Sequence, residues 1–289
     1  MNISLATITE TNEIAKFIAR LNQQKSTHIG YVGTEFEEIV ATLEDDFVLE
    51  NGHLSFVILK NEDDEIVGAI GLDIDENSAE VWGPFGDSVS EEALTILWQT
   101  TLEQFPYVET AHFFVNLENI TQQNFIEQLH PKKTGEHLTL TISKENFVPL
   151  ISQRLVPFQT GDEKDFESLH NEQFPNTYYD AKTIITRIND NNKLLLLKNE
   201  QQELQGYAYF EVKPVFGDAS LDYIAVSPKH QNQGLGTLML KEVLQEIFKY
   251  DNIIKINLCV SNDNDQANHV YMKAGFKKEN ILLSYTLER

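Results

Sequence analysis

The chain has 289 residues, of which 41% are hydrophobic and 23% charged, and its formal net charge is −23. The length allows two domains of ordinary size, and the composition is that of a globular protein able to bury a core. Such acidity argues against nucleic acid or an anionic membrane as a partner and would suit a cationic substrate.

The charge is unevenly spread, because residues 1–147 carry 7 Lys and Arg against 26 Asp and Glu. A solubilising surface is the simpler explanation of most of it. No apolar run approaches the ~20 residues of a membrane-spanning helix. The N-terminal stretch has no basic region followed by an apolar one, so we expect a cytoplasmic protein. The single cysteine, Cys259, lies in the apolar run INLCV and is expected to be a small core residue.

Periodicity and capping signals predict the elements of the first half. After an initial strand come helices at 10–21 and 35–43, a hairpin, a strand at 79–82, a helix at 90–104, a strand at 111–116, a helix at 121–129 and a strand at 137–143.

The second half repeats this order. It predicts a strand at 154–159, helices at 160–174 and 180–190, strands at 194–198, 204–213 and 219–226, a helix at 236–249, a strand at 253–260, a helix at 265–273 and a strand at 281–287. The hairpin ILKNEDDEIVGA at 58–69 recurs as LLKNEQQELQGY at 196–207, an offset of 138 residues. We therefore predict two α/β (α+β) domains of the same kind, 1–147 and 148–289.

The stretch QNQGLG lies where a predicted strand passes to a helix. Gly234 and Gly236 permit positive backbone angles and close approach of a ligand. The following helix offers free N–H groups and the positive end of its dipole, which together suit a phosphate. A tight turn with no ligand explains two glycines equally simply, and the pattern is neither a Walker loop nor a Rossmann fingerprint.

A second pattern, NDQANHVYMKAGF, follows the next strand. Asn264 or Asp265 can cap the helix, Ala267 and Tyr271 share one of its faces, and Gly275 suits its C-terminal turn. Considered without the rest of the pattern, Tyr271 could simply be an aromatic residue of the hydrophobic core.

Together the two patterns resemble the GNAT acyltransferase superfamily, whose acyl-CoA loop is Gln/Arg-x-x-Gly-x-Gly/Ala. The resemblance implies two tandem domains, each with a mixed, mostly antiparallel central sheet flanked by helices, and acetyl-CoA as acyl donor without a metal. It implies that the donor lies along one strand, on the loop and at the second helix, at Ile224, Ala225, Val226, Gln231, Asn232, Gln233, Gly234, Leu235, Gly236, Thr237, Asn264 and Ala267. It also implies that Tyr271 is the general acid for the leaving thiolate.

The general base is less defined. Alternation places Ser220, Asp222, Ile224 and Val226 on one strand face, and Asp222 is the candidate, with Glu211 as the alternative. Asp222 is equally well explained as a plain hydrogen-bonding strand residue, and a base acting through water needs neither carboxylate.

The first half departs from both patterns. Pro84 removes a backbone donor, and Asp87, Glu91 and Glu92 would repel a pyrophosphate at the helix start. Ile126 stands where the tyrosine would be. We predict a degenerate copy that keeps the fold and binds no cofactor.

The expected function is N-acetyl transfer from acetyl-CoA to a primary amine by direct attack in the second domain. A longer acyl group is an alternative, and so is a non-catalytic acyl-CoA sensor or scaffold. The acceptor is expected to be a small-molecule or peptide amine, and the protein a monomer or homodimer. Phe174, Tyr178 and Tyr179 either wall the acceptor site or only pack a helix on the sheet.

Overall fold

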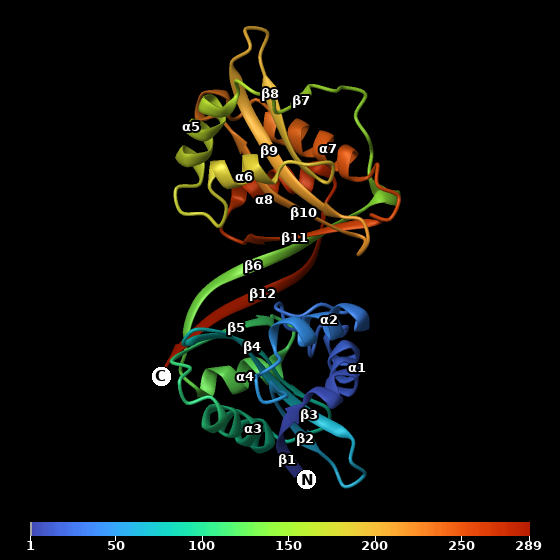
Figure 1. Ribbon diagram of the computed structural model, residues 1–289, viewed down its shortest axis with the longest axis vertical. Coiled ribbons are helices and arrows are strands. Elements are labelled where there is room, and N and C mark those ends of the chain that lie inside the picture. The colour runs from blue at the N-terminus through green and yellow to red at the C-terminus, as the bar shows by residue number, and fades with distance from the viewer. Residues whose placement is uncertain (1) are drawn as a thin grey trace. The chain divides into compact units, whose positions relative to one another are not determined.

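The computed structural model describes residues 2–289, which form two compact units (Figure 1). The first unit is Met1–Leu138 with Asn280–Arg289, and the second is Thr139–Glu279. The division differs from the predicted one at 147/148, because the C-terminal strand belongs to the first unit. None of the described helices is long and apolar enough to cross a membrane.

The first unit is built around a sheet in the order β1-β2-β3-β4-β5-β12. Its strands are antiparallel except β4 and β5, which pair in parallel over only three residues each, 78–80 with 110–112. Its elements are β1 (Asn2–Thr7), α1 (Thr11–Asn22), α2 (Phe36–Asp46), β2 (His53–Lys60), β3 (Ile66–Asp75), β4 (Ser78–Gly86), α3 (Glu91–Gln104), β5 (Thr110–Asn116), α4 (Ile120–Gln128), most of β6 (Lys132–Ser143) and most of β12 (Lys277–Glu288).

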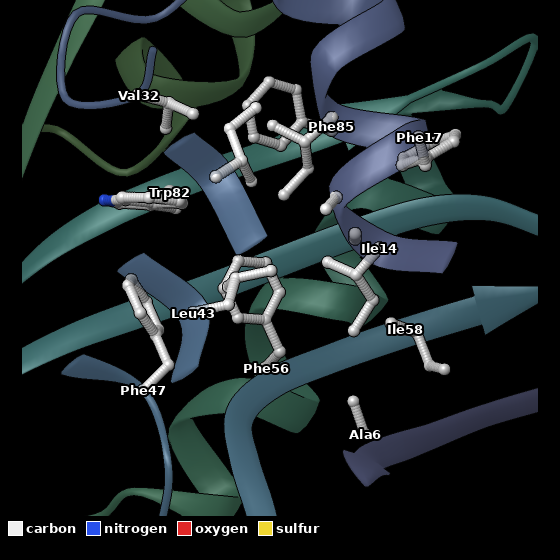
Figure 2. Packing of buried hydrophobic residues seen from close by; sticks show 14 of the residues in the cluster. Ala6, Ile14, Phe17, Val32, Leu43, Phe47, Phe56, Ile58, Trp82 and Phe85 are labelled. Atoms are coloured by element: carbon white, nitrogen blue, oxygen red, sulfur yellow. The ribbon is translucent and has the colours of Figure 1, made fainter. Parts of the chain in front are cut away.

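Apolar side chains cover both faces of this sheet. Figure 2 shows one cluster, in which Ile14 and Phe17 of α1, Phe56 of β2 and Trp82 of β4 are buried together. Phe47 follows α2, and its ring centroid lies 4.6 Å from that of Trp82. Burial of these rings explains how a chain with so acidic a first half holds a stable core.

The second unit repeats the order of elements. Its four-stranded antiparallel sheet has the order β10-β9-β8-β7, and β11 lies beside β6 in a different sheet. Its elements are β7 (Leu155–Pro157), α5 (Glu163–Gln173), α6 (Ala181–Arg187), β8 (Asn192–Lys198), β9 (Leu204–Lys213), β10 (Asp218–Val226), α7 (Leu235–Ile247), β11 (Lys255–Ser261) and α8 (Asp265–Ala274).

The last strand of each half is exchanged. Strand β12, from the end of the chain, pairs with β5 from Leu282 opposite Asn116 to Glu288 opposite Thr110. Its Leu283 and Tyr285 are buried in the core of the first unit. The order of elements in the sequence predicts that such a strand exists but not which sheet accepts it, and the predicted division at 147/148 fails for that reason.

The repeated hairpin has the same turn in both units. Asn61 Oδ1 accepts the N–H groups of Asp63 and Glu65, at 3.0 and 2.9 Å. In the second unit, Asn199 Oδ1 accepts from Gln201 and Glu203 at the same distances. The matching sequence therefore encodes matching local structure.

Cys259 is exposed on β11, so the expectation of a core residue was wrong. The strand is covered on one face only, where Ile256 is buried. Alternation along the strand places Cys259 on the opposite face.

Candidate functional site

The site begins where β10 ends and α7 starts. Gly234 caps α7 with φ +78°, and no side chain bonds the helix start. An added Cβ at Gly234 would meet no heavy atom within 4 Å, so the space beside this residue is open. Gln231 Nε2 donates to the carbonyl of Val226 at 3.1 Å and ties the loop to the strand.

The first turn of α7 presents unpaired N–H groups. The first helical bond runs from Leu238 N to Gly234 O, so the N–H groups of Leu235, Gly236 and Thr237 precede the intrahelical ladder. No acidic residue occupies this turn. The N-terminus of α7 is therefore free to receive an anion.

The middle of α8 lies against the same place. A Cβ on Gly236 would lie 3.6 Å from Val270 of α8 and 3.8 Å from Val226 of β10. Asn264 caps α8, its Oδ1 accepting from Ala267 N at 3.0 Å. The end of β10, the start of α7 and one face of α8 thus converge.

Tyr271 is half-buried on α8. Its ring centroid lies 5.5 Å from that of Phe276, which follows the C-terminal turn at Gly275. Burial raises the pKa of its phenol, so the hydroxyl keeps its proton at neutral pH. Within residues 2–289 no hydrogen-bond partner engages this hydroxyl, which leaves it available as a donor.

Strands β10 and β11 are neighbours in the fold but are not hydrogen-bonded to each other. Ile224, Ala225 and Val226 pair with β9 along one edge of β10. None of the described strands pairs with the other edge, so this edge can bind an extended ligand as it would bind an added strand.

The predicted common face of β10 is interrupted by a bulge at Asp222. Leu221 lies opposite Phe210, whereas Tyr223 lies opposite Tyr209. Phe210 and Tyr209 are consecutive and point to opposite faces, so the extra residue shifts the alternation by one.

The predicted grouping of Ser220 with Ile224 and Val226 was therefore wrong. Ser220 lies opposite Glu211, on the side of the sheet that carries α5 and α6. Ile224 and Val226 point to the other side, toward α7. Period-two reasoning on sequence alone cannot detect an inserted residue.

The two carboxylates considered as bases differ in their partners. Glu211 accepts from Arg187 Nε and Nη2, at 2.9 and 2.8 Å, and from the Tyr209 hydroxyl at 2.6 Å. Asp222 is exposed, and Ser220 Oγ donates to it at 3.3 Å. Desolvation raises the pKa of Asp222, the Ser220 hydrogen bond opposes this, and the nearby Glu211 charge adds to the rise. Asp222 therefore accepts fewer hydrogen bonds than Glu211 and is the freer of the two to accept a proton.

The segment between α5 and α6 forms the other wall of this side. Phe174 packs on His170 and Tyr223, with centroid distances of 5.6 and 5.1 Å, as the packing alternative predicted. Tyr178, by contrast, is 88% exposed, and its ring lies 4.7 Å from that of Tyr179.

No local pattern in the sequence predicts the ion pair of Arg187 with Glu211. The two residues are 24 positions apart, on a helix and a strand that meet only in the fold.

The corresponding slot of the first unit is filled by the chain itself. Gly30 N donates to Phe114 O at 2.6 Å, and Asn116 N donates to His28 O at 3.1 Å. The loop after α1 therefore occupies the edge of β5 that β4 leaves unpaired. A Cβ on Gly30 would lie 2.3 Å from the Phe114 ring, so the loop is tightly packed there.

The helix start in the first unit is also closed. Ser90 Oγ accepts from Ala93 N at 3.3 Å, and Glu91 and Glu92 occupy the first turn of α3. The remaining cavity beside it measures about 60 Å³. Ile126, at the position of Tyr271, is fully buried.

A larger cavity of about 380 Å³ lies elsewhere in the second unit, at the C-terminal end of α7. Its buried Glu242 accepts from the N–H groups of Arg154 and Leu155 and anchors β7. The cavity contains none of the predicted site residues.

Comparisons with known proteins identify the second unit. The model of the acetyltransferase (GNAT) family matches residues 163–276. Spermidine N(1)-acetyltransferase of Escherichia coli (strain K12) is 37% identical over 60 residues, which are 21% of this chain and 32% of that protein. The chain thus spans about a third of the length of the curated relatives it matches.

Solved structures show the same fold. A GCN5-related N-acetyltransferase from Sphaerobacter thermophilus has a TM-score of 0.74 and 14% identity, covering 99% of this chain and 95% of that one. A tandem GNAT protein from the clavulanic acid biosynthesis pathway has a TM-score of 0.62 and 13% identity, covering 99% and 98%. The predicted fold class is confirmed, and the predicted family is confirmed for residues 163–276.

Proposed function

Because residues 163–276 belong to the acetyltransferase (GNAT) family, we propose that the second unit transfers an acetyl group from acetyl-CoA to a primary amine. The observation that carries the proposal is the open, uncapped start of α7 beside the unpaired edge of β10. These two features accept, respectively, a pyrophosphate and an extended amide-bearing arm.

The residues proposed to hold the donor fall into three groups. The edge of β10 at 224–226 pairs with the pantetheine arm. The N–H groups from Gln231 to Thr237 bind the pyrophosphate, with Asn232 and Gly234 supplying the positive φ angles that turn the loop. Asn264 and Ala267, at the start of α8, form the third group of proposed donor contacts.

The reaction proceeds by direct attack. The amine nitrogen, as a neutral base, attacks the thioester carbonyl, and the C–N bond forms as the carbonyl electrons move to oxygen. Asp222, directly or through water, takes the proton that the nitrogen loses. The C–S bond then breaks, and the electron pair leaves with sulfur as a thiolate.

Tyr271 assists the departure of sulfur. A thiol has a pKa of about 8.5 and a phenol about 10, so full proton transfer is uphill by roughly 2 kcal/mol. Burial raises the pKa of Tyr271, but the same desolvation raises that of a thiol beside it. A hydrogen bond from Tyr271 to the leaving sulfur already stabilises the thiolate.

The first unit is proposed to bind no donor. Its slot is closed by the loop at 28–30, and its helix start is capped and acidic. One donor per chain follows from this difference.

The test is an acceptor screen with the whole chain and acetyl-CoA, following release of free thiol and the acetylated product by mass spectrometry. Acetyl transfer to at least one amine class, lost in Tyr271→Phe, is expected. Binding of acetyl-CoA without transfer to any amine in an exhaustive screen would instead support the sensor.

A further inference from the structure

We infer that the acceptor is an organic amine with no carboxylate beside its reactive nitrogen, bound as a cation between Asp222 and the Tyr178–Tyr179 pair. This inference rests on the proposed function and names the substrate class of the same site. It comes from the charges and aromatic rings on the side of β9 and β10 that carries α5 and α6.

The first step concerns the charged side chains on this side of β9 and β10. Arg187 holds Glu211 through two hydrogen bonds of 2.9 and 2.8 Å, so their charges cancel. Asp222 lies near this pair, and no described residue forms a contact ion pair with it, although the more distant Lys213 offsets part of its charge. Asp222 is therefore the carboxylate on this side that is left free to contact an ammonium group.

The second step is that, within residues 2–289, this side of β9 and β10 has no guanidinium free to bind an α-carboxylate. The Arg187 guanidinium is held by Glu211 and stacks over Tyr179, 4.5 Å from the ring centroid. Lys213 is the one basic residue on β9 and β10. It lies three residues beyond Phe210, about 10 Å along the strand from the bulge at Asp222. The charge of Lys213 already acts on Asp222, and a lysine ammonium lacks the two-pronged geometry with which a free guanidinium binds a carboxylate.

The third step is the rigidity of the aromatic wall. His170 Nε2 donates to the carbonyl of Tyr179 at 3.0 Å, which leaves Nδ1 to accept from the Tyr207 hydroxyl at 2.6 Å. The Tyr223 hydroxyl accepts from Tyr179 N at 3.0 Å and bonds Thr177 Oγ1 at 2.6 Å. The segment is therefore held on both sides of Tyr178.

An aromatic ring that is 88% exposed on a fixed segment is preorganised for contact with a ligand. The Tyr178 ring can cover an apolar or aromatic body, or take a second ammonium on its face. Arylalkylamines and aliphatic diamines have this chemistry, and amino acids add a carboxylate that Asp222 repels.

Matched substrates test the inference: tyramine against tyrosine, and phenethylamine against phenylalanine. Each pair differs by one carboxylate. The full chain with saturating acetyl-CoA is expected to use each decarboxylated amine with a kcat/KM at least about tenfold above that of its amino acid. Binding of tyramine and tyrosine in the presence of CoA, by calorimetry, gives a readout that does not depend on transfer.

Two variants distinguish an effect of local charge on the preference for tyramine from an effect of a disturbed structure. Glu211→Gln and Arg187→Gln both break the same ion pair but change the local charge in opposite directions. Glu211→Gln frees the guanidinium, so the tyramine preference is expected to narrow through a lower KM for tyrosine. Arg187→Gln leaves Glu211 unneutralised, so the preference is expected to widen.

The outcomes are distinct. Transfer with equal use of tyramine and tyrosine, or both variants shifting the preference in the same direction, would overturn the inference alone. No transfer to any amine, with tyramine still bound in preference to tyrosine, would overturn the proposed function alone. Neither transfer nor binding would overturn both.

Discussion

Alanine at Gly234 and at Gly52 should affect stability alike and ligand binding differently. Both glycines have φ +78°, and at neither would an added Cβ meet a heavy atom within 4 Å. A positive φ costs an L-residue about 1–2 kcal/mol, offset by about 0.4–1 kcal/mol from the smaller entropy of the unfolded chain. Each variant is therefore expected to lose about 1 kcal/mol of unfolding free energy.

Gly236→Ala should have the opposite effect on stability. Gly236 is in the first turn of α7 without a positive φ, and its added Cβ would make ordinary contacts at 3.6–3.8 Å with Val270 and Val226. Replacing a helical glycine by alanine gains up to about 1 kcal/mol. A gain in stability with a loss of binding cannot be attributed to misfolding.

The binding loss follows from the N–H groups beside these glycines. A hydrogen bond to a charged group contributes about 1.5–3 kcal/mol, so displacing one phosphate contact weakens binding roughly 10- to 100-fold. Gly236→Ala and Gly234→Ala are each expected to raise the Kd for acetyl-CoA by at least about tenfold, and the double variant further. Gly52→Ala is expected to leave the Kd unchanged.

Urea denaturation gives the free energies of unfolding, and isothermal calorimetry with acetyl-CoA gives the Kd values. The reasoning is refuted if Gly236→Ala is as stable as predicted and binds acetyl-CoA like the wild type. It is also refuted if Gly52→Ala weakens binding as much as Gly234→Ala does.

Three further predictions concern single side chains. Tyr271→Phe should keep the affinity for acetyl-CoA and lower kcat by roughly 10²–10⁴-fold, the usual contribution of a general acid. The loss of kcat should be smaller at high pH. An unchanged kcat would show that the hydroxyl takes no part in the reaction. Because the pKa of Asp222 is raised, kcat/KM should fall as Asp222 becomes protonated, at a pH above the usual pKa of an aspartate. If the Asp222→Asn variant shows the same fall in kcat/KM at low pH, Asp222 is not the base. Leu283→Ala should destabilise the first unit by about 2–5 kcal/mol in urea denaturation, since Leu283 is 3% exposed in that core; a loss below about 1 kcal/mol would contradict the exchanged-strand arrangement.

The sequence predicted what depends on local signals. Strand and helix order follows from periodicity and capping, and the turns at Asn61 and Asn199 follow from the hairpin sequence repeated at 58–69 and 196–207. The open helix start at Gly234 follows from glycines in a strand-to-helix turn.

Features set by distant contacts were not predictable from the sequence. The exchange of β12 depends on which sheet edge is free, and the bulge at Asp222 appears only when β10 pairs with β9. The closure of the first slot by Gly30 is likewise set by a contact with Phe114, 84 positions along the chain.

Hydrogen–deuterium exchange of the whole chain, with and without CoA, tests the central claim most directly, because it locates the donor in one experiment. We predict slower exchange in peptides covering 224–237 and 264–271 when CoA is bound, and no change in those covering 84–95. Protection at the start of α3 in the first unit, or unchanged exchange at the start of α7, would contradict the assignment of the second unit as the site of acetyl transfer.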